Sequence, residues 1–199
     1  MAIEVAVIVT DTSPLITLAA AQSLDYLLYP ALPVVIPDAV FYEATAQIDR
    51  LGAQEIIDWQ RRSPETVLIE PTEAFKNELQ RLTRQGGRLV RDLGERAAVE
   101  AVRSFPLAAD HRAILLSDDR DVERIVVVDP QRIILLTTWD YLRQLEEARL
   151  IQSADAVVEA ARERGRNPPV ADIWSRHDPV VRDAVRAAIE RAHGRKDGV

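Results

Sequence analysis

The sequence predicts an α/β fold with a parallel central sheet and helices on both faces. Short aliphatic and β-branched runs alternate with segments whose apolar residues recur at helical spacing. The runs are almost continuously apolar, as expected of strands that are covered on both faces. With 199 residues, 47% of them hydrophobic, the chain is long enough for one globular domain with a sizeable core.

The first part of the chain contains two predicted strands, each followed by a helix. Residues 3–10 form the first strand, and Ser13 and Pro14 fit the N-cap and the first position of a helix. Residues 34–36 form the second strand. Pro37 then leads into a helix that reaches about residue 46.

The middle of the chain is predicted to be mainly helical. Residues 51–62 and 73–85 have helical spacing and are separated by a short apolar run, residues 67–69. Gly86 and Gly87 end the second of these helices. A further helix, rich in alanine and valine, opens at Glu95.

The last part of the chain supplies two more strands, over residues 114–117 and 133–137. Residues 122–128 between them are ambiguous, because their β-branching favours a strand whereas parallel neighbours need a crossover helix. Residues 138–164 are predicted to be helical. A final amphipathic helix is expected over about 179–193.

We expect a main domain of residues 1–166 followed by a C-terminal helical extension of residues 167–199, because Asn167-Pro168-Pro169 interrupts the helical pattern. The chain has no cysteine, so it has neither a disulfide framework nor a thiolate zinc site. Its first apolar stretch carries Glu4 and is too short to span a bilayer. A soluble cytoplasmic protein that does not bind membranes is the expectation.

Carboxylates recur where a predicted strand ends or a helix begins. Asp11 follows the first strand, and Glu43 lies shortly after the second. Glu95 opens a helix, and Asp118 and Asp119 follow a buried strand. Because the carboxyl ends of parallel strands open into one crevice, we expect these acids to gather there. They would repel one another unless a cation joined them, and an oxygen-rich set without cysteine suits Mg²⁺ or Mn²⁺.

Each acid also has an ordinary structural explanation. Asp11 has the position of a helix cap, and Asp118 and Asp119 have the positions of loop or N-cap residues. Asp92 and Glu95 have the spacing of a capping box, with Asp92 as N-cap, and we prefer that structural role for Asp92. The prediction of a site therefore rests on the coincidence of the acids and not on any one of them.

The charge distribution allows two interpretations of a basic segment. The net charge of −7 argues against general affinity for nucleic acid. Residues 74–91 nevertheless hold five basic side chains and a single acid, Glu78. The segment is either a solvated helix face or an edge that binds phosphates. The basic side chains are Lys76, Arg81, Arg84, Arg88 and Arg91.

Five short motifs, in the right order, resemble the PIN-domain nucleases, including the VapC-like toxin nucleases. The resemblance covers about residues 5–150. The motifs are Val9-Thr10-Asp11-Thr12-Ser13, Ile36-Pro37-Asp38 with Glu43, Leu93-Gly94-Glu95, Ser117-Asp118-Asp119, and Leu136-Thr137-Thr138.

The resemblance implies a PIN-like three-layer α/β/α fold and metal-assisted hydrolysis of phosphodiester bonds, with single-stranded RNA as the expected substrate. It implies Asp11, Glu43 and Glu95 as catalytic metal ligands, joined by Asp119 or Asp118. Thr12, Ser13 and Thr137 would be polar groups that support these ligands. An antitoxin protein is the partner that a toxin would have, and a homodimer stays open.

Two other classes of protein are alternatives to a nuclease. A phosphoacceptor receiver domain would place an acid pair after the first strand and a lysine after the last. Here a single Asp11 and the pair Thr137-Thr138 stand at those places. The stronger alternative is a PIN-like fold that serves as a binding module with little or no catalysis. One departure from the family pattern is Glu95, where many members carry aspartate.

Overall fold

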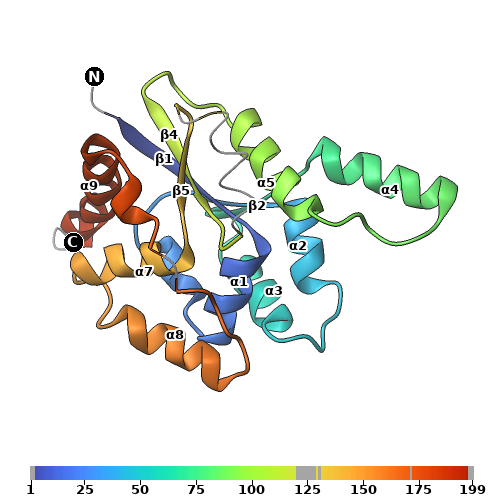
Figure 1. The fold of residues 1–199 in the computed structure, drawn as a ribbon, viewed down its shortest axis with the longest axis horizontal. Helices are drawn as coiled ribbons and strands as arrows, with labels where there is room; N and C mark the ends of the chain where they lie inside the picture. The colour runs from blue at the N-terminus through green and yellow to red at the C-terminus, as the bar shows by residue number, and fades with distance from the viewer. Residues whose placement is uncertain (1–2, 120–128, 130, 171, 197–199) are drawn as a thin grey trace.

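The computed structural model describes residues 3–119, 129, 131–170 and 172–196 (Figure 1). Its centre is a five-stranded sheet with the strand order β3-β2-β1-β4-β5, and every pair of neighbours is parallel. The predicted α/β fold with a parallel sheet is confirmed. The strands are β1 (Glu4–Thr10), β2 (Val34–Pro37), β3 (Val67–Glu70), β4 (His111–Leu116) and β5 (Ile133–Leu136).

Alternate residues of the strands enter opposite halves of the core. On β1, Ile8 packs into one cluster, whereas Val7 and Val9 pack into a second one. Because both sets are fully buried, the strand reads as a continuous apolar run. The first cluster includes residues of α1 (Thr12–Ala20), α3 (Ala53–Arg62), α7 (Thr138–Glu147), α8 (Ala154–Glu163) and α9 (Pro179–Lys196), and the second includes α5 (Leu93–Ser104).

Two helices stand near the C-terminal end of the sheet. α2 (Asp38–Thr45) contacts α5, and α4 (Glu73–Gln85) extends outward from the body of the protein (Figure 1). A small cluster containing Ala39, Phe75 and Leu93 joins α2, α4 and the start of α5. The carboxylate of Glu100 on α5 accepts hydrogen bonds from the backbone N–H groups of Glu73 and Ala74, which fixes the first turn of α4.

Two predicted helix starts are wrong in detail. α1 begins at Thr12, and its N-cap is Asp11, whose Oδ1 accepts from the Thr12 N–H at 2.7 Å; Ser13 is not the cap. At α5, Asp92 does occupy the N-cap position, but its φ of 63° is left-handed and its side chain makes no capping hydrogen bond. The predicted capping box is therefore absent.

The prediction that residues 138–164 are helical is confirmed only in part. The chain forms α7 and α8, separated by a turn in which Arg149 has a φ of 60°. Ser153 restarts the helix by accepting a hydrogen bond from the N–H of Ala156. The apolar run 67–69 belongs to strand β3, and residues 122–128 lie outside the described residues.

The C-terminal segment is fastened to the rest of the molecule. Its final helix is confirmed as α9, and Val181, Val185 and Ile189 lie in the larger core cluster. The buried carboxylate of Asp140, on α7, accepts hydrogen bonds from the backbone N–H groups of Ile173 and Trp174. None of the described helices combines the length and apolar character needed to cross a membrane.

Candidate active site

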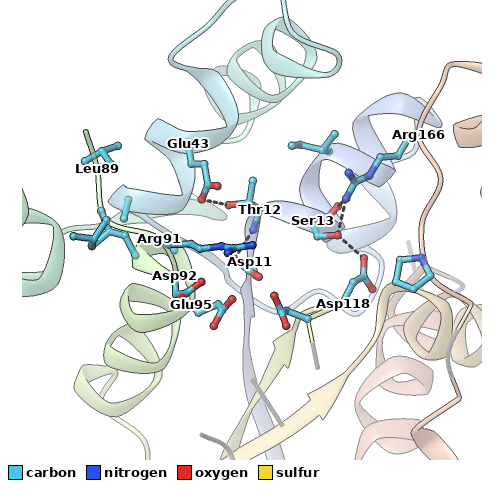
Figure 2. Close-up of a pocket in the computed structure, with 17 residues that line it drawn as sticks. Asp11, Thr12, Ser13, Glu43, Leu89, Arg91, Asp92, Glu95, Asp118 and Arg166 are labelled. Carbon is cyan, nitrogen blue, oxygen red and sulfur yellow. Dashed lines mark hydrogen bonds between the residues drawn. The ribbon is translucent and has the colours of Figure 1, made fainter. Parts of the chain in front are cut away.

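A cleft of about 590 Å³ opens at the C-terminal ends of β1 and β4 (Figure 2). From β1 the chain adds β2 and β3 on one side of the sheet, and β4 and β5 on the other. The cleft therefore lies where the strand order reverses, which is the usual ligand position in open parallel sheets. Six carboxylates and two guanidinium groups line it: Asp11, Glu43, Asp92, Glu95, Asp118, Asp119, Arg91 and Arg166.

Asp11 lies at the floor of the cleft, between the last residue of β1 and the first of α1. Its side chain is buried and accepts hydrogen bonds from the Thr12 N–H at 2.7 Å and the Ser117 hydroxyl at 3.1 Å. Burial raises the pKa of Asp11 to about 6 despite these bonds, and the charges of Glu43 and Asp118 add to the rise. A cation in the cleft would remove this penalty.

Glu43 projects into the cleft from α2, where it lies close to the start of α5. The hydroxyl of Thr12 donates to Glu43 Oε2 at 3.0 Å. A β-carbon added to Gly94 would lie 3.0 Å from the same Glu43 oxygen and 3.3 Å from Asp11 Oδ1. Glycine at position 94 therefore leaves the space into which two carboxylates from different elements project.

Glu95 and Asp119 face each other across the cleft. Desolvation raises the pKa of Glu95 to about 7, and a hydrogen bond between its carboxyl group and that of Asp119 contributes to the rise. Two carboxylates can share a hydrogen bond only when one of them holds a proton. The negative charge of Asp119 also adds to the rise, because the two acids repel each other when both are ionised.

Asp118 is held in place by three hydrogen bonds. Its Oδ1 accepts from the Thr138 N–H at 2.8 Å, and its Oδ2 accepts from the hydroxyls of Ser13 and Thr138, each at 2.9 Å. Asp118 thus has a fixed orientation, whereas Asp119, the next residue, faces Glu95. The two acids that the sequence left as alternatives have different surroundings.

Comparison with known proteins gives the family of the chain. A family model described as a PIN domain matches residues 7–165, which include all six acids of the cleft. The chain belongs to the PIN-domain family. PIN domains are generally nucleases and typically use divalent metal ions. No curated protein and no solved structure matches the chain.

The acids of this PIN domain fit a divalent cation by their chemistry, although they are not already arranged around one. Within the described ranges, no group of three or more His, Cys, Asp or Glu side chains forms a ready-made ligand set. The donors are all oxygens, as Mg²⁺ and Mn²⁺ prefer. The raised pKa values of Asp11 and Glu95 both indicate crowded, desolvated negative charge that a cation would offset.

The structure brings most of the residues singled out in the sequence to this cleft. Thr12 and Ser13 both donate hydrogen bonds to its acids. Thr137 forms a capping box with Asp140 at the start of α7. Its neighbour Thr138 supplies two of the three hydrogen bonds that hold Asp118.

Sequence reasoning missed Arg166 and the part that Ser117 plays. Ser117 stood in a recognised motif, and its hydroxyl bonds Asp11. Arg166 carries no motif and reaches the cleft only because Gly165, with a φ of 86°, reverses the chain after α8. The signal that was available is a glycine at the end of a predicted helix, which marks a left-handed C-terminal turn.

Two side chains of the basic segment pair with acids of α4. Arg81 makes two hydrogen bonds to Glu78, at 2.7 and 2.8 Å, and a third to the carbonyl oxygen of Arg88. Lys76 pairs with Glu73 on the exposed surface. Of the five basic side chains in residues 74–91, all of which are described, Arg91 is the one that lines the cleft.

Proposed function

We propose that this PIN domain is a Mg²⁺- or Mn²⁺-dependent nuclease that hydrolyses phosphodiester bonds in single-stranded RNA. The observation that carries the proposal is the convergence of acids from four separate parts of the chain on one cleft. These acids are Asp11, Glu43, Glu95, and Asp118 with Asp119. Family membership supports the reaction class.

The residues of the cleft suit metal-assisted hydrolysis better than covalent catalysis. When bound, one or two Mg²⁺ ions would activate water and stabilise charge on the leaving oxygen. The hydroxyls of Thr12 and Ser13 donate to Glu43 and Asp118 and so orient these acids, and among the described residues no histidine that could activate a hydroxyl nucleophile lines the cleft. Asp11, Glu43, Glu95, Asp118 and Asp119 would hold the metal.

The size of the cleft favours an unpaired strand. A volume of about 590 Å³ matches that of a site for a small molecule, comparable to one or two nucleotides. The choice of RNA over DNA rests on the resemblance to the VapC-like toxin nucleases. That resemblance also supports a cytoplasmic toxin that an antitoxin protein neutralises.

Cleavage of labelled oligonucleotides tests the proposal. The full chain is incubated with single-stranded RNA, single-stranded DNA or duplex RNA, in Mn²⁺ or Mg²⁺, with and without EDTA. We expect cleavage of single-stranded RNA that EDTA abolishes and that Asp11→Asn lacks, while that variant keeps the circular dichroism spectrum of the parent. Full activity of Asp11→Asn would refute the assignment of the site. RNA binding without cleavage by the parent would favour the binding-module alternative.

The toxin role needs a separate experiment. Induced expression of the parent should arrest bacterial growth, whereas Asp11→Asn at equal abundance should not. Growth arrest by both proteins would mean that toxicity does not depend on the acids of the cleft. Light scattering on the purified chain measures whether it forms a homodimer.

A further inference from the structure

Arg166 is placed beside the acids by the end of α8. Its backbone N–H donates to the carbonyl of Ala161 at 2.9 Å, and Gly165 takes the left-handed conformation that this turn requires. The guanidinium then points toward α1 (Figure 2), where Nη2 donates to the Ser13 hydroxyl at 2.6 Å and Nε to the Thr17 hydroxyl at 3.2 Å. Nη1 of Arg166 has no hydrogen-bond partner among the described residues.

Arg91 enters the cleft from the loop that follows α4, on the side opposite Arg166 in Figure 2. Glu78 accepts a hydrogen bond from the Val90 N–H at 2.8 Å, and Arg81 joins Glu78 to the Arg88 carbonyl. The hydrogen bond from Arg81 lowers the pKa of Glu78 to about 2, so the Glu78 carboxylate that holds this loop is charged at neutral pH. The loop directs the side chain of Arg91 toward the acids (Figure 2).

Both arginines keep their charge available for a ligand. Neither forms an ion pair with a carboxylate in the part of the chain that the structure describes, although both line a cleft with six carboxylates. Such a cleft repels a polyanion, so a nucleic acid strand needs cationic contacts outside the acids. A guanidinium fork is suited to binding phosphate through two parallel N–H···O bonds.

We infer that Arg91 and Arg166 bind the phosphates on either side of the scissile one, and that the strand runs between them across the acids. The choice of substrate rests on the proposed function. Arg166 also helps to orient an acid of the cleft, because it donates to the Ser13 hydroxyl, and that hydroxyl donates to Asp118. The exposed face of α4 is then not the main site of RNA contact.

Salt-dependent binding tests this inference without requiring catalysis. All binding is measured on the Asp11→Asn protein with labelled single-stranded RNA, at fixed Mg²⁺, over a salt series. Each phosphate contact adds about 0.7 to the magnitude of the log–log salt slope for single strands. We expect Arg166→Gln and Arg91→Gln each to lower the slope by about 0.7, which makes the loss of affinity about 2.6-fold larger at 50 mM than at 200 mM salt.

The variants Arg166→Lys and Arg164→Gln separate charge from structure. Lysine keeps the charge but cannot reproduce the fork on Ser13 and Thr17, so Arg166→Lys should keep the parent slope. Arg164 is exposed and lies 3.5 Å from Glu55, outside the cleft, so Arg164→Gln should leave the slope unchanged although it removes the same formal charge.

Unchanged slopes in Arg166→Gln and Arg91→Gln would overturn the inference. A slope lowered by Arg88→Gln and not by Arg91→Gln would also overturn it, and would favour the face of α4. These results are distinct from failure of the proposed function, in which the parent protein does not cleave RNA although its Asp11→Asn form binds RNA with the expected slopes.

Discussion

Asp11→Asn should stabilise the metal-free protein although it removes a catalytic acid. The pKa of Asp11 rises from an ordinary value of 3.8 to about 6 in the folded chain, mainly because the side chain is buried. One unit of pKa corresponds to about 1.4 kcal/mol, so the ionised carboxylate opposes folding by about 3 kcal/mol. Asparagine has no charge to desolvate, and its Oδ1 can still accept from Thr12.

The stabilisation by Asp11→Asn should depend on pH in a defined direction. Because the folded parent binds the Asp11 proton more tightly than the unfolded chain does, the parent loses stability as pH rises from about 4 to about 6. The variant has no such loss. The difference in the free energy of unfolding should therefore be near zero at pH 4 and reach about 2–3 kcal/mol above pH 6.

Thermal and urea unfolding in EDTA at several pH values measure this difference. For a chain of this length, 2–3 kcal/mol corresponds to a rise in Tm of about 4–12 °C. Asp155→Asn is a matched control, because Asp155 is exposed in the first turn of α8 and the same substitution there removes no buried charge. A variant that is less stable than the parent at pH 8, or a gain that does not vary with pH, would refute the reasoning.

Three further variants separate activity from stability. Gly94→Ala should lower the rate of cleavage about 10²-fold, because the added β-carbon displaces the Glu43 carboxylate. Its stability should not fall, because alanine has a higher helix propensity than glycine, and near-parental activity would contradict the prediction. Asp140→Ala should lower the free energy of unfolding in urea by about 2–4 kcal/mol, because the N–H groups of Thr137, Ile173 and Trp174 lose their acceptor. A decrease below about 1 kcal/mol would contradict this prediction. Asp92→Ala should lower the free energy of unfolding by about 1 kcal/mol, whereas Asp92→Gly should not, because the backbone at position 92 is left-handed. Equal decreases for the two variants would indicate a different role for the Asp92 side chain.

The acids of the cleft were predictable because their positions follow from periodicity. Asp11 and Asp118 directly follow apolar runs, and parallel strands put their C-terminal ends at one edge of the sheet. The parallel sheet was predictable for the same reason, since its strands are buried on both faces. What these acids do stays a prediction until cleavage is measured.

Other features depended on backbone conformation and tertiary contacts that the pattern of residues does not reveal. Asp92 has the spacing of a capping residue, but its left-handed backbone turns the side chain away from the cap. The division between α7 and α8 depends on Arg149, which adopts a positive φ although it is not glycine. Arg166 lies beyond every recognised motif, and only the folding of α8 against α1 places it beside Ser13.

The hydrogen bonds that orient Asp118 and Ser13 have a consequence for the order of synthesis. Ser13 bonds Asp118 across 105 positions of sequence and Arg166 across 153. Contacts of such long range form late, because the intervening chain must first be synthesised and folded. A ribosome that is making this protein must therefore synthesise the chain beyond Arg166 before Ser13 and Arg166 can meet. For a chain proposed to cut RNA, this delay would separate its own translation from the onset of its activity.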